Sequence, residues 1–346
     1  MNLTKKTFVI AEIGNNHEGR FDVAKKLIFK AKQCGADAVK FQTFIPEYFV
    51  PKSNKKRYEQ LKNFKLTFKQ FKKLADYSKK IGIIFFSTPF DIKSAEFLNK
   101  IQQIFKISSG DNNFLPLINI IAKFNKTIFL STGLANIKQI TKVKNLILNL
   151  WKKKAKNSKK LAILHCVSSY PVVESEANLL AIKTLKSKFS DCIIGYSDHT
   201  QGILAPIIAV ILGAKIIEKH FTLDKSFSSF RDHQISANPK EMREMIDKIR
   251  KAELMLGSGK KELQISEKKN IKFMRRSIVA RIDIPKGKKI SMSDLDFKKT
   301  GNGVKASGGD KDGRGCRQPD LRLQTGRKWR SPSYRLGRGS RLAPRG

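Results

Sequence analysis

Short apolar segments of strand length alternate with longer segments of helical periodicity through the first two thirds of this chain. Eight segments rich in Val, Ile, Leu and Phe are predicted as strands: Phe8–Glu12, Ala38–Gln42, Ile83–Ser87, Phe105–Ser108, Thr127–Ser131, Leu161–Cys166, Ile193–Ser197 and Ile216–His220. Helical spacing of apolar residues is present between them, in Val23–Cys34, Phe68–Lys80, Ser94–Asn99, Leu115–Phe124 and Ile137–Trp151. Near-continuous apolar strands separated by helices indicate a parallel sheet that is covered on both faces.

The number of repeats predicts the form of the sheet. Eight strand–helix units within about 220 residues fit a (β/α)8 TIM barrel, for which about 250 residues are usual. A doubly wound open sheet is the alternative, but no glycine-rich nucleotide-binding turn follows the first strand. The sequence therefore predicts an α/β protein with a barrel over residues 1–260.

Polar and ionisable residues stand at the carboxyl end of every predicted strand, where TIM barrels place their active sites. A capping role for the following helix explains some of the Ser and Thr residues. It does not explain Lys40 and Lys106, because a buried ammonium group is costly unless an anion meets it. With the nearby hydroxyls and the Ser109–Gly110 turn, these lysines predict a phosphate or carboxylate ligand at this end of the barrel.

Three of the five histidines lie between Cys192 and Ser236. His199 and His220 stand at the ends of two consecutive predicted strands, with a segment of helical length between them. A lone histidine is usually a satisfied core residue. Two imidazoles at matched strand ends, however, favour a shared divalent metal ion.

The formal net charge of +41 is typical of nucleic-acid-binding proteins, but the distribution of charge does not favour that partner. From Lys305 onward, 12 Lys and Arg residues stand against 3 Asp, and residues 1–304 contain 50 Lys but only 8 Arg. Those lysines are spaced along predicted helices, as solvated helix faces are. We therefore expect no nucleic-acid partner, and polyanion binding only as a secondary property.

The compartment is predicted from the cysteines and the apolar runs. The four cysteines form no CxxC motif or framework spacing, which indicates reduced thiols and a cytoplasmic protein. Glu12 interrupts the first apolar run, so no signal peptide is expected. The most apolar run, 203–217, is too short to span a membrane and is predicted as a buried helix that leads into a buried strand.

Eight motifs follow one another in the order of the predicted strands: AEIGNNHEG (11–19), GADAVKFQT (35–43), FFSTPFD (85–91), KISSGD (106–111), LSTG (130–133), HCVSSYP (165–171), GYSDHT (195–200) and EKHFTLD (218–224). They resemble the N-acetylneuraminate (sialic acid) synthase family, which includes the legionaminic and pseudaminic acid synthases. The resemblance implies a TIM barrel followed by a small antifreeze-like (SAF) domain. It also implies a transferase that condenses phosphoenolpyruvate with N-acetylmannosamine, or a related diacetamido sugar, and water to give a nonulosonic (sialic) acid and phosphate.

The resemblance assigns roles to individual residues. It implies that phosphoenolpyruvate is held by Lys40, Lys106, Ser109, Ser131 and Ser197, and that Glu12, Lys40 and Lys106 are catalytic. The metal, Mn²⁺ or Mg²⁺, is assigned to His199 and His220. The sugar is assigned to Glu12, Gln42, Tyr170, Asp232 and Lys299.

Four places differ from the sialic acid synthase pattern, so legionaminic and pseudaminic acid remain open as products. Asp111 stands in place of Glu, Ser168 in place of Asn, and Lys299 in place of an Arg of the small domain. The segment Lys225–Arg231, with the Asp232–His233 pair that follows it, also differs from the sialic acid enzymes, which carry Pro and Gly there. A non-catalytic, basic polyanion-binding protein on the same scaffold is the alternative from another functional class.

The carboxyl-terminal part is predicted in three pieces after the amphipathic helix Lys240–Leu256. Residues 261–274 are predicted as a linker, and residues 275–304 as an incomplete antifreeze-like domain. The resemblance implies a homodimer in which this domain, if complete, is swapped between partners. Residues 305–346 are rich in Arg and Gly, and we interpret them as a disordered or frameshifted tail.

Overall fold

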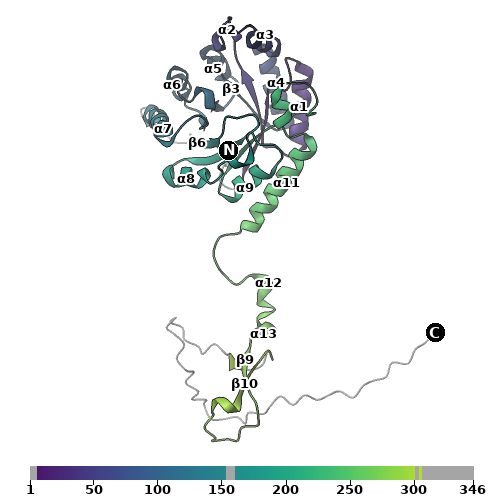
Figure 1. The fold of residues 1–346 in the computed structure, drawn as a ribbon, viewed down its shortest axis with the longest axis vertical. Coiled ribbons are helices and arrows are strands. Elements are labelled where there is room, and N and C mark those ends of the chain that lie inside the picture. Colours follow the sequence, from purple (N-terminus) through teal and green to yellow (C-terminus); the bar gives the residue numbers. More distant parts are fainter. Residues whose placement is uncertain (1–5, 153–159, 301–303, 306–346) are drawn as a thin grey trace, which may run out of the picture. The chain divides into compact units, whose positions relative to one another are not determined.

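The computed structural model describes residues 6–152, 160–300 and 304–305, and the chain divides into two compact units, residues 1–258 and 259–346 (Figure 1). The tail predicted over 305–346 lies outside the described residues except for Lys305. Each unit is considered by itself below.

The first unit is built on eight parallel strands. Their bounds are β1 (Phe8–Gly14), β2 (Ala38–Thr43), β3 (Ile84–Pro89), β4 (Ile104–Ile107), β5 (Thr127–Ser131), β6 (Leu161–Cys166), β7 (Ile193–Asp198) and β8 (Ile216–His220). The hydrogen-bonded order is β3-β2-β1-β8-β7-β6-β5-β4, which is a nearly closed (β/α)8 barrel. All eight predicted strands are present, so the predicted TIM barrel is confirmed.

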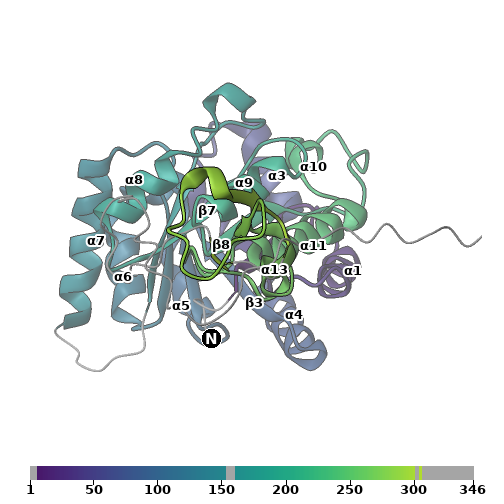
Figure 2. The same ribbon diagram turned by 90° about the horizontal axis from the view of Figure 1, so that it is seen from below.

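Helices surround the strands, as Figures 1 and 2 show, with α1 beside α4 and α6 beside α7 in both views. The helices are α1 (Phe21–Gln33), α2 (Pro46–Phe49), α3 (Lys55–Phe64), α4 (Phe68–Ile81), α5 (Ile92–Leu98), α6 (Leu115–Lys123), α7 (Ile137–Lys152), α8 (Ala181–Lys188), α9 (Leu204–Ile211), α10 (Arg231–Ile235) and α11 (Pro239–Leu256). The sequence did not predict α2, α3, α8 and α10. The buried helix predicted after residue 203 is present as α9 and buries Ala205, Pro206, Ala209 and Val210, but Leu204 and Ile211 at its two ends are exposed.

Local sequence explains where the longer helices begin and end. Thr67 and Gln70 form a capping box at the start of α4, and Gly82 ends that helix in the left-handed conformation at φ 73°. Asn238 and Glu241 form the same box at the start of α11. These caps satisfy backbone groups that a helix leaves free at its ends.

The barrel has one seam, between β3 and β4. These strands lie side by side, but no strand ladder joins them among the described residues. The side chain of Gln102 bridges the seam instead. Its amide oxygen accepts from the backbone N–H of Ser87 at 2.8 Å, and its amide nitrogen donates to the Ser87 carbonyl at 3.1 Å. A buried side-chain amide thus replaces a backbone partner.

Alternation along the strands divides the core into two layers. Inward-facing residues such as Phe8, Ile10, Phe86 and Phe129 fill the barrel interior. Their neighbours, such as Val9, pack outward against the helices. At β7 the strands approach so closely that a Cβ atom on Gly195 would lie 2.8 Å from the Cβ atom of Ile216, which explains the glycine.

The second unit contains a small antiparallel sheet in the order β10-β9-β11. Its elements are α12 (Ile265–Lys268), α13 (Ile271–Met274), β9 (Ser277–Ala280), β10 (Leu295–Lys298) and β11 (Val304–Lys305). Ile278, Ala280, Ile284 and Leu295 form its small apolar core. The short strands predicted after Arg275 are therefore present, whereas the antifreeze-like identity of this unit remains a prediction.

No helix in the described parts of the chain is both long enough and apolar enough to cross a bilayer.

Candidate active site

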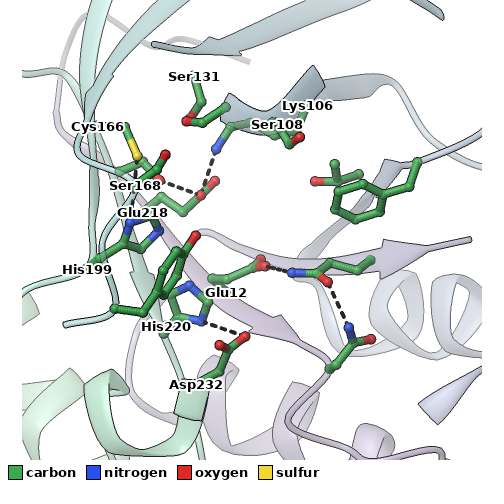
Figure 3. Close-up of a pocket in the computed structure, with 18 of the residues that line it drawn as sticks. Glu12, Lys106, Ser108, Ser131, Cys166, Ser168, His199, Glu218, His220 and Asp232 are labelled. Carbon is green, nitrogen blue, oxygen red and sulfur yellow. Dashed lines mark hydrogen bonds and ion pairs between the residues drawn. The ribbon is translucent and has the colours of Figure 1, made fainter. Parts of the chain in front are cut away.

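A pocket of about 340 Å³ opens at the carboxyl ends of the barrel strands. Its wall includes every site residue predicted from the sequence except Lys299, namely Glu12, Lys40, Gln42, Lys106, Ser109, Ser131, Tyr170, Ser197, His199, His220 and Asp232. Figure 3 shows the side chains of Glu12, Lys106, Ser131, His199, His220 and Asp232 converging from several strands and loops. Lys299 is exposed and follows β10 in the second unit, so its contact with a sugar remains a prediction.

The period of two along each strand explains why these side chains meet. On β4 the inward residue Ile104 is followed two positions later by Lys106, and on β8 the inward residue Ile216 is followed by Glu218 and His220. Inward positions are therefore apolar at the start of a strand and polar at its end. The same rule places Lys40 two residues after the inward-facing Ala38.

Glu218 organises the floor of the pocket, and the sequence analysis gave it no role. Its Oε1 atom accepts from Lys106 Nζ at 2.7 Å (Figure 3) and from Ser197 Oγ at 2.8 Å. The same atom lies 3.8 Å from Lys40 Nζ. Lys106 is 3% exposed and Lys40 4%. Glu218 stands two residues before His220 on the same strand, and residues at this spacing share a face. That spacing was the signal by which the sequence could have placed Glu218 in the site.

Glu12 is the second carboxylate of the floor. Lys40 Nζ lies 2.8 Å from its Oε2 atom, and the strand register places Glu12 between Lys40 and His220. Gln42 donates to Glu12 Oε1 at 3.4 Å, and Asn15 donates to Gln42 at 2.8 Å. A chain of side-chain hydrogen bonds thus fixes the Glu12 carboxyl group.

The pKa values of the Glu12 and Glu218 carboxyl groups are shifted in opposite directions. Burial raises the pKa of Glu12 to about 7, against the attraction of Lys40. Burial also opposes ionisation of Glu218, but the ammonium groups of Lys106 and Lys40 outweigh it and hold the pKa of Glu218 at about 2. Glu218 is therefore a permanent anion, whereas Glu12 gains or loses a proton near neutral pH.

On another side of the pocket, the hydroxyl groups of Ser109 and Ser168 lie close to Gly133. The backbone N–H of Gly133 donates to Ser109 Oγ at 3.1 Å. A Cβ atom at Gly133 would lie 2.3 Å from Ser168 Oγ and 2.7 Å from Ser109 Oγ, so only glycine allows the two hydroxyls to approach. The buried Ser168 hydroxyl has no hydrogen-bond partner among the described residues. This cradle is suited to an oxyanion.

The two predicted metal ligands lie together, with His199 and His220 ring centroids 5.4 Å apart. His199 Nδ1 bonds the Val167 carbonyl at 2.7 Å, which is the outer contact that orients metal-binding histidines. His220 Nδ1 is buried without a hydrogen-bond partner in the described structure, and it lies 3.9 Å from Asp232 Oδ2. These features fit a divalent ion on the two histidines.

The protein alone supplies few ligands for such an ion. Within the described residues, no three His, Cys, Asp and Glu side chains are grouped as a metal centre. Two histidines would therefore leave the remaining coordination positions to substrate or water, as in open catalytic sites.

The outer rim of the pocket combines Tyr170, which the sequence assigned to the sugar, with Arg57, Phe230 and Arg231, to which it gave no role. The Arg231 guanidinium lies 4.5 Å from the centroid of the Tyr170 ring, and Tyr170 packs on His199 at 4.2 Å between centroids. Arg57 of α3 and Phe230 also line the rim. Burial lowers the pKa of Arg57, and the nearby Arg231 adds to this effect. Because α3 was not predicted, Arg57 had no place in the sequence-based site.

Comparison with known proteins gives a consistent result. Residues 27–261 match the model of the NeuB family. The chain is 42% identical over 316 residues to an N,N'-diacetyllegionaminic acid synthase of Campylobacter jejuni, covering 87% of this chain and 93% of the relative. It is 37% identical over 308 residues to a pseudaminic acid synthase of the same species, covering 85% and 87%.

A solved structure agrees with these relatives. The crystal structure of an N-acetylneuraminic acid synthetase from Leptospira borgpetersenii, in complex with citrate, superposes with a TM-score of 0.72. The two chains are 38% identical, and the match covers 78% of this chain and 91% of that one.

Proposed function

Because this chain belongs to the NeuB family of sugar-acid synthases, we propose that it condenses phosphoenolpyruvate with an N-acetylated amino sugar and water to give a nonulosonic acid and phosphate. The observation that carries this proposal is the pair of buried ammonium groups, Lys40 and Lys106, at the floor of a pocket that also holds paired histidines. Lys40 faces Glu12 and Lys106 faces Glu218, but an ammonium group has three N–H donors, so each lysine can also bind the carboxylate or the phosphate of phosphoenolpyruvate.

We propose that the lysines and the hydroxyl cradle bind phosphoenolpyruvate. Glu218 Oε1 accepts hydrogen bonds from both Lys106 and Ser197, so the two side chains are already oriented before substrate binds. The remaining N–H bonds of Lys106 are then available to an anion. The Ser109 and Ser168 hydroxyls beside Gly133 supply further donors, and charge-assisted hydrogen bonds of this kind stabilise the departing phosphate.

We propose Glu12 as the group that moves a proton. A carbon–carbon bond forms between C3 of phosphoenolpyruvate and the aldehyde carbon of the sugar. The carbonyl π pair passes to the aldehyde oxygen, which takes up a proton, and positive charge develops at C2. Water adds at C2 and releases a proton. Phosphate then leaves by cleavage of its C–O bond as the new C2 hydroxyl loses its proton and becomes the ketone. A carboxyl group with a pKa of about 7 is suited to accept the proton that water releases at neutral pH.

His199 and His220 would hold a divalent ion, Mn²⁺ or Mg²⁺, and such an ion would polarise the sugar aldehyde as a Lewis acid. The roles of the chain's own groups are to keep both imidazoles oriented and largely shielded from water. The Val167 carbonyl orients His199, and burial lowers the pKa of His220, which keeps its ring neutral and able to act as a ligand.

We propose a diacetamido-trideoxy sugar, rather than N-acetylmannosamine, as the preferred acceptor. Support comes from the identity of 42% to the N,N'-diacetyllegionaminic acid synthase, which is higher than the 38% to the N-acetylneuraminic acid synthetase of Leptospira borgpetersenii. Ser168 stands where sialic acid synthases have Asn, and Asp111 stands where they have Glu. Both differences agree with a sugar other than the sialic acid precursor. Cytoplasmic location and a homodimer with a swapped small domain are further parts of this proposal.

The test is phosphate release from phosphoenolpyruvate by the purified chain with Mn²⁺. N-acetylmannosamine and the diacetamido sugar are offered separately, each with and without chelator. Chelator-sensitive release with the diacetamido sugar is expected. Release with N-acetylmannosamine alone would overturn the proposed acceptor, and no release with either sugar from folded protein would overturn the proposed reaction.

A further inference from the structure

The segment after β8, residues 224–233, forms part of the pocket rim through Phe230, Arg231 and Asp232. We call it the rim segment. Only its final residues lie in a helix, α10, and Arg231 is 61% exposed in its side chain. Phe230, Asp232 and His233 are buried, whereas the exposed Arg231 side chain must be held by its neighbours to form a binding surface.

Polar contacts from the loop after β1 supply that support. Glu18 Oε1 accepts from the Ser228 hydroxyl and lies 3.3 Å from His233 Nε2. Asn16 Nδ2 donates to the Phe221 carbonyl and to Ser236 Oγ, both at 2.9 Å. The loop after β1 thus contacts the rim segment itself through Glu18. Through Asn16 it contacts the chain before and after the segment.

His233 links the two sides of this arrangement. Its side chain is fully buried, and Nδ1 lies 2.7 Å from Thr222 Oγ1. Phe227 and Phe230 pack on the ring at centroid distances of 5.2 and 6.1 Å. Nε2 can donate to Glu18, and Nδ1 then faces the Thr222 hydroxyl, which also donates to the Asp224 carbonyl at 2.9 Å. Burial lowers the pKa of His233 and so favours the neutral ring.

The backbone of the β1 loop is shaped for the contact. Glu18 has φ 46°, which is uncommon for a residue other than glycine, and Gly19 follows at φ 77°. A Cβ atom on Gly19 would lie 2.1 Å from the Asn63 carbonyl oxygen, so the loop packs directly on the end of α3. The loop is held in a restricted conformation that directs Glu18 toward the rim segment.

We propose that Glu18 and His233 are positioning residues that hold the rim segment, and with it Arg231 and Asp232, in the geometry that binds the acceptor sugar. Neither residue lies on the floor where phosphoenolpyruvate is proposed to bind. The inference rests on the proposed function for the identity of the acceptor, but the contact itself does not. Its signature is a selective loss of acceptor affinity.

The experiment compares Glu18→Ala with Glu18→Gln and with Glu96→Ala, an exposed residue of α5 that serves as the control. Glu18→Ala removes a charged acceptor of two hydrogen bonds, so KM for the sugar is expected to rise about tenfold. KM for phosphoenolpyruvate and kcat are expected to stay within about twofold of the wild type. Glu18→Gln is expected to restore sugar binding, because an amide oxygen accepts the same bonds.

A second measurement does not depend on turnover. Amide hydrogen exchange, followed by mass spectrometry, is expected to accelerate about tenfold in peptides from residues 224–233 of Glu18→Ala and to stay unchanged in β4 and β5. Equal acceleration throughout the barrel, no acceleration, or a Glu18→Gln variant as impaired as Glu18→Ala would overturn the inference. Absence of turnover in the wild type would count against the proposed function alone, since exchange still decides the role of Glu18.

Discussion

Lys219 Nζ lies 2.7 Å from Asp198 Oδ2, and both side chains are fully buried. Each residue immediately precedes one of the paired histidines, because Asp198 is followed by His199 and Lys219 by His220. Side chains alternate along a strand, so this ion pair lies on the outer face of the barrel while the histidines lie inside. The pair connects the ends of β7 and β8 and thereby fixes the separation of the two imidazoles.

Lys219→Met is expected to lower the free energy of unfolding by about 3–5 kcal/mol, because it leaves the Asp198 carboxylate buried without its cation. Denaturant unfolding measures the change. Lys72→Met is the matched control, since Lys72 pairs with Asp76 at 3.1 Å with both side chains exposed, and a loss below about 1 kcal/mol is expected there. Equal losses in the two variants would contradict a special role for the buried pair.

Gln102 is expected to be essential for closing the barrel. Gln102→Ala leaves the Ser87 N–H and carbonyl without partners in a buried seam, so a loss of about 2–4 kcal/mol is expected from two unmade hydrogen bonds. Gln103→Ala tests the exposed neighbour and should change the unfolding free energy by less than about 0.5 kcal/mol. A Gln102→Ala protein as stable as Gln103→Ala would show that the seam closes without the amide.

Lys106 is expected to bind the anionic substrate rather than support the fold alone. Lys106→Met should reduce kcat/KM for phosphoenolpyruvate by at least about 100-fold, since it removes a charge-assisted donor from a buried site. Lys79→Met, at an exposed position on α4, is the control and should retain full activity. Phosphate release measures both, and retained activity in folded Lys106→Met would remove Lys106 from the proposed mechanism.

The proton-transfer role of Glu12 predicts a pH dependence. If Glu12 accepts a proton with a pKa of about 7 in the free enzyme, kcat/KM should rise with pH through that value and level off above it. Glu12→Gln should abolish this rising limb and lower kcat by about 100-fold or more. A wild-type profile that lacks an ionisation near 7, or one that persists in Glu12→Gln, would exclude Glu12 as the base.

Stability gives an independent test of the same carboxyl group. The pKa of Glu12 is raised on folding, so the folded protein binds the proton more tightly than the unfolded chain does. The stability associated with this group is fully present below the unfolded pKa of about 4.5 and is lost as pH rises toward about 7. The free energy of unfolding of Glu12→Gln, relative to the wild type, should therefore increase between these two pH values.

The sequence by itself determined the barrel and most of the pocket. Strand and helix are encoded by local apolar spacing, and polar residues such as Lys40 and Lys106 stand at the ends of apolar strands, where they can be identified without knowledge of their partners. The parallel architecture then places all such ends on one face. That geometric rule explains the predicted site residues at the strand ends, whereas Asp232 on α10 was assigned only through the family resemblance. Eleven of the twelve predicted site residues line one pocket.

Only the tertiary structure decided which of these side chains pair. Lys106 and Glu218 are 112 residues apart, and closure of the barrel, rather than any local pattern, sets their 2.7 Å contact. The same holds for Arg57, which reaches the rim from a short helix with weak apolar periodicity, and for the contact of Glu18 with His233. Proton affinities depend on these distances and on burial, because Coulomb attraction and desolvation act through space and not along the chain.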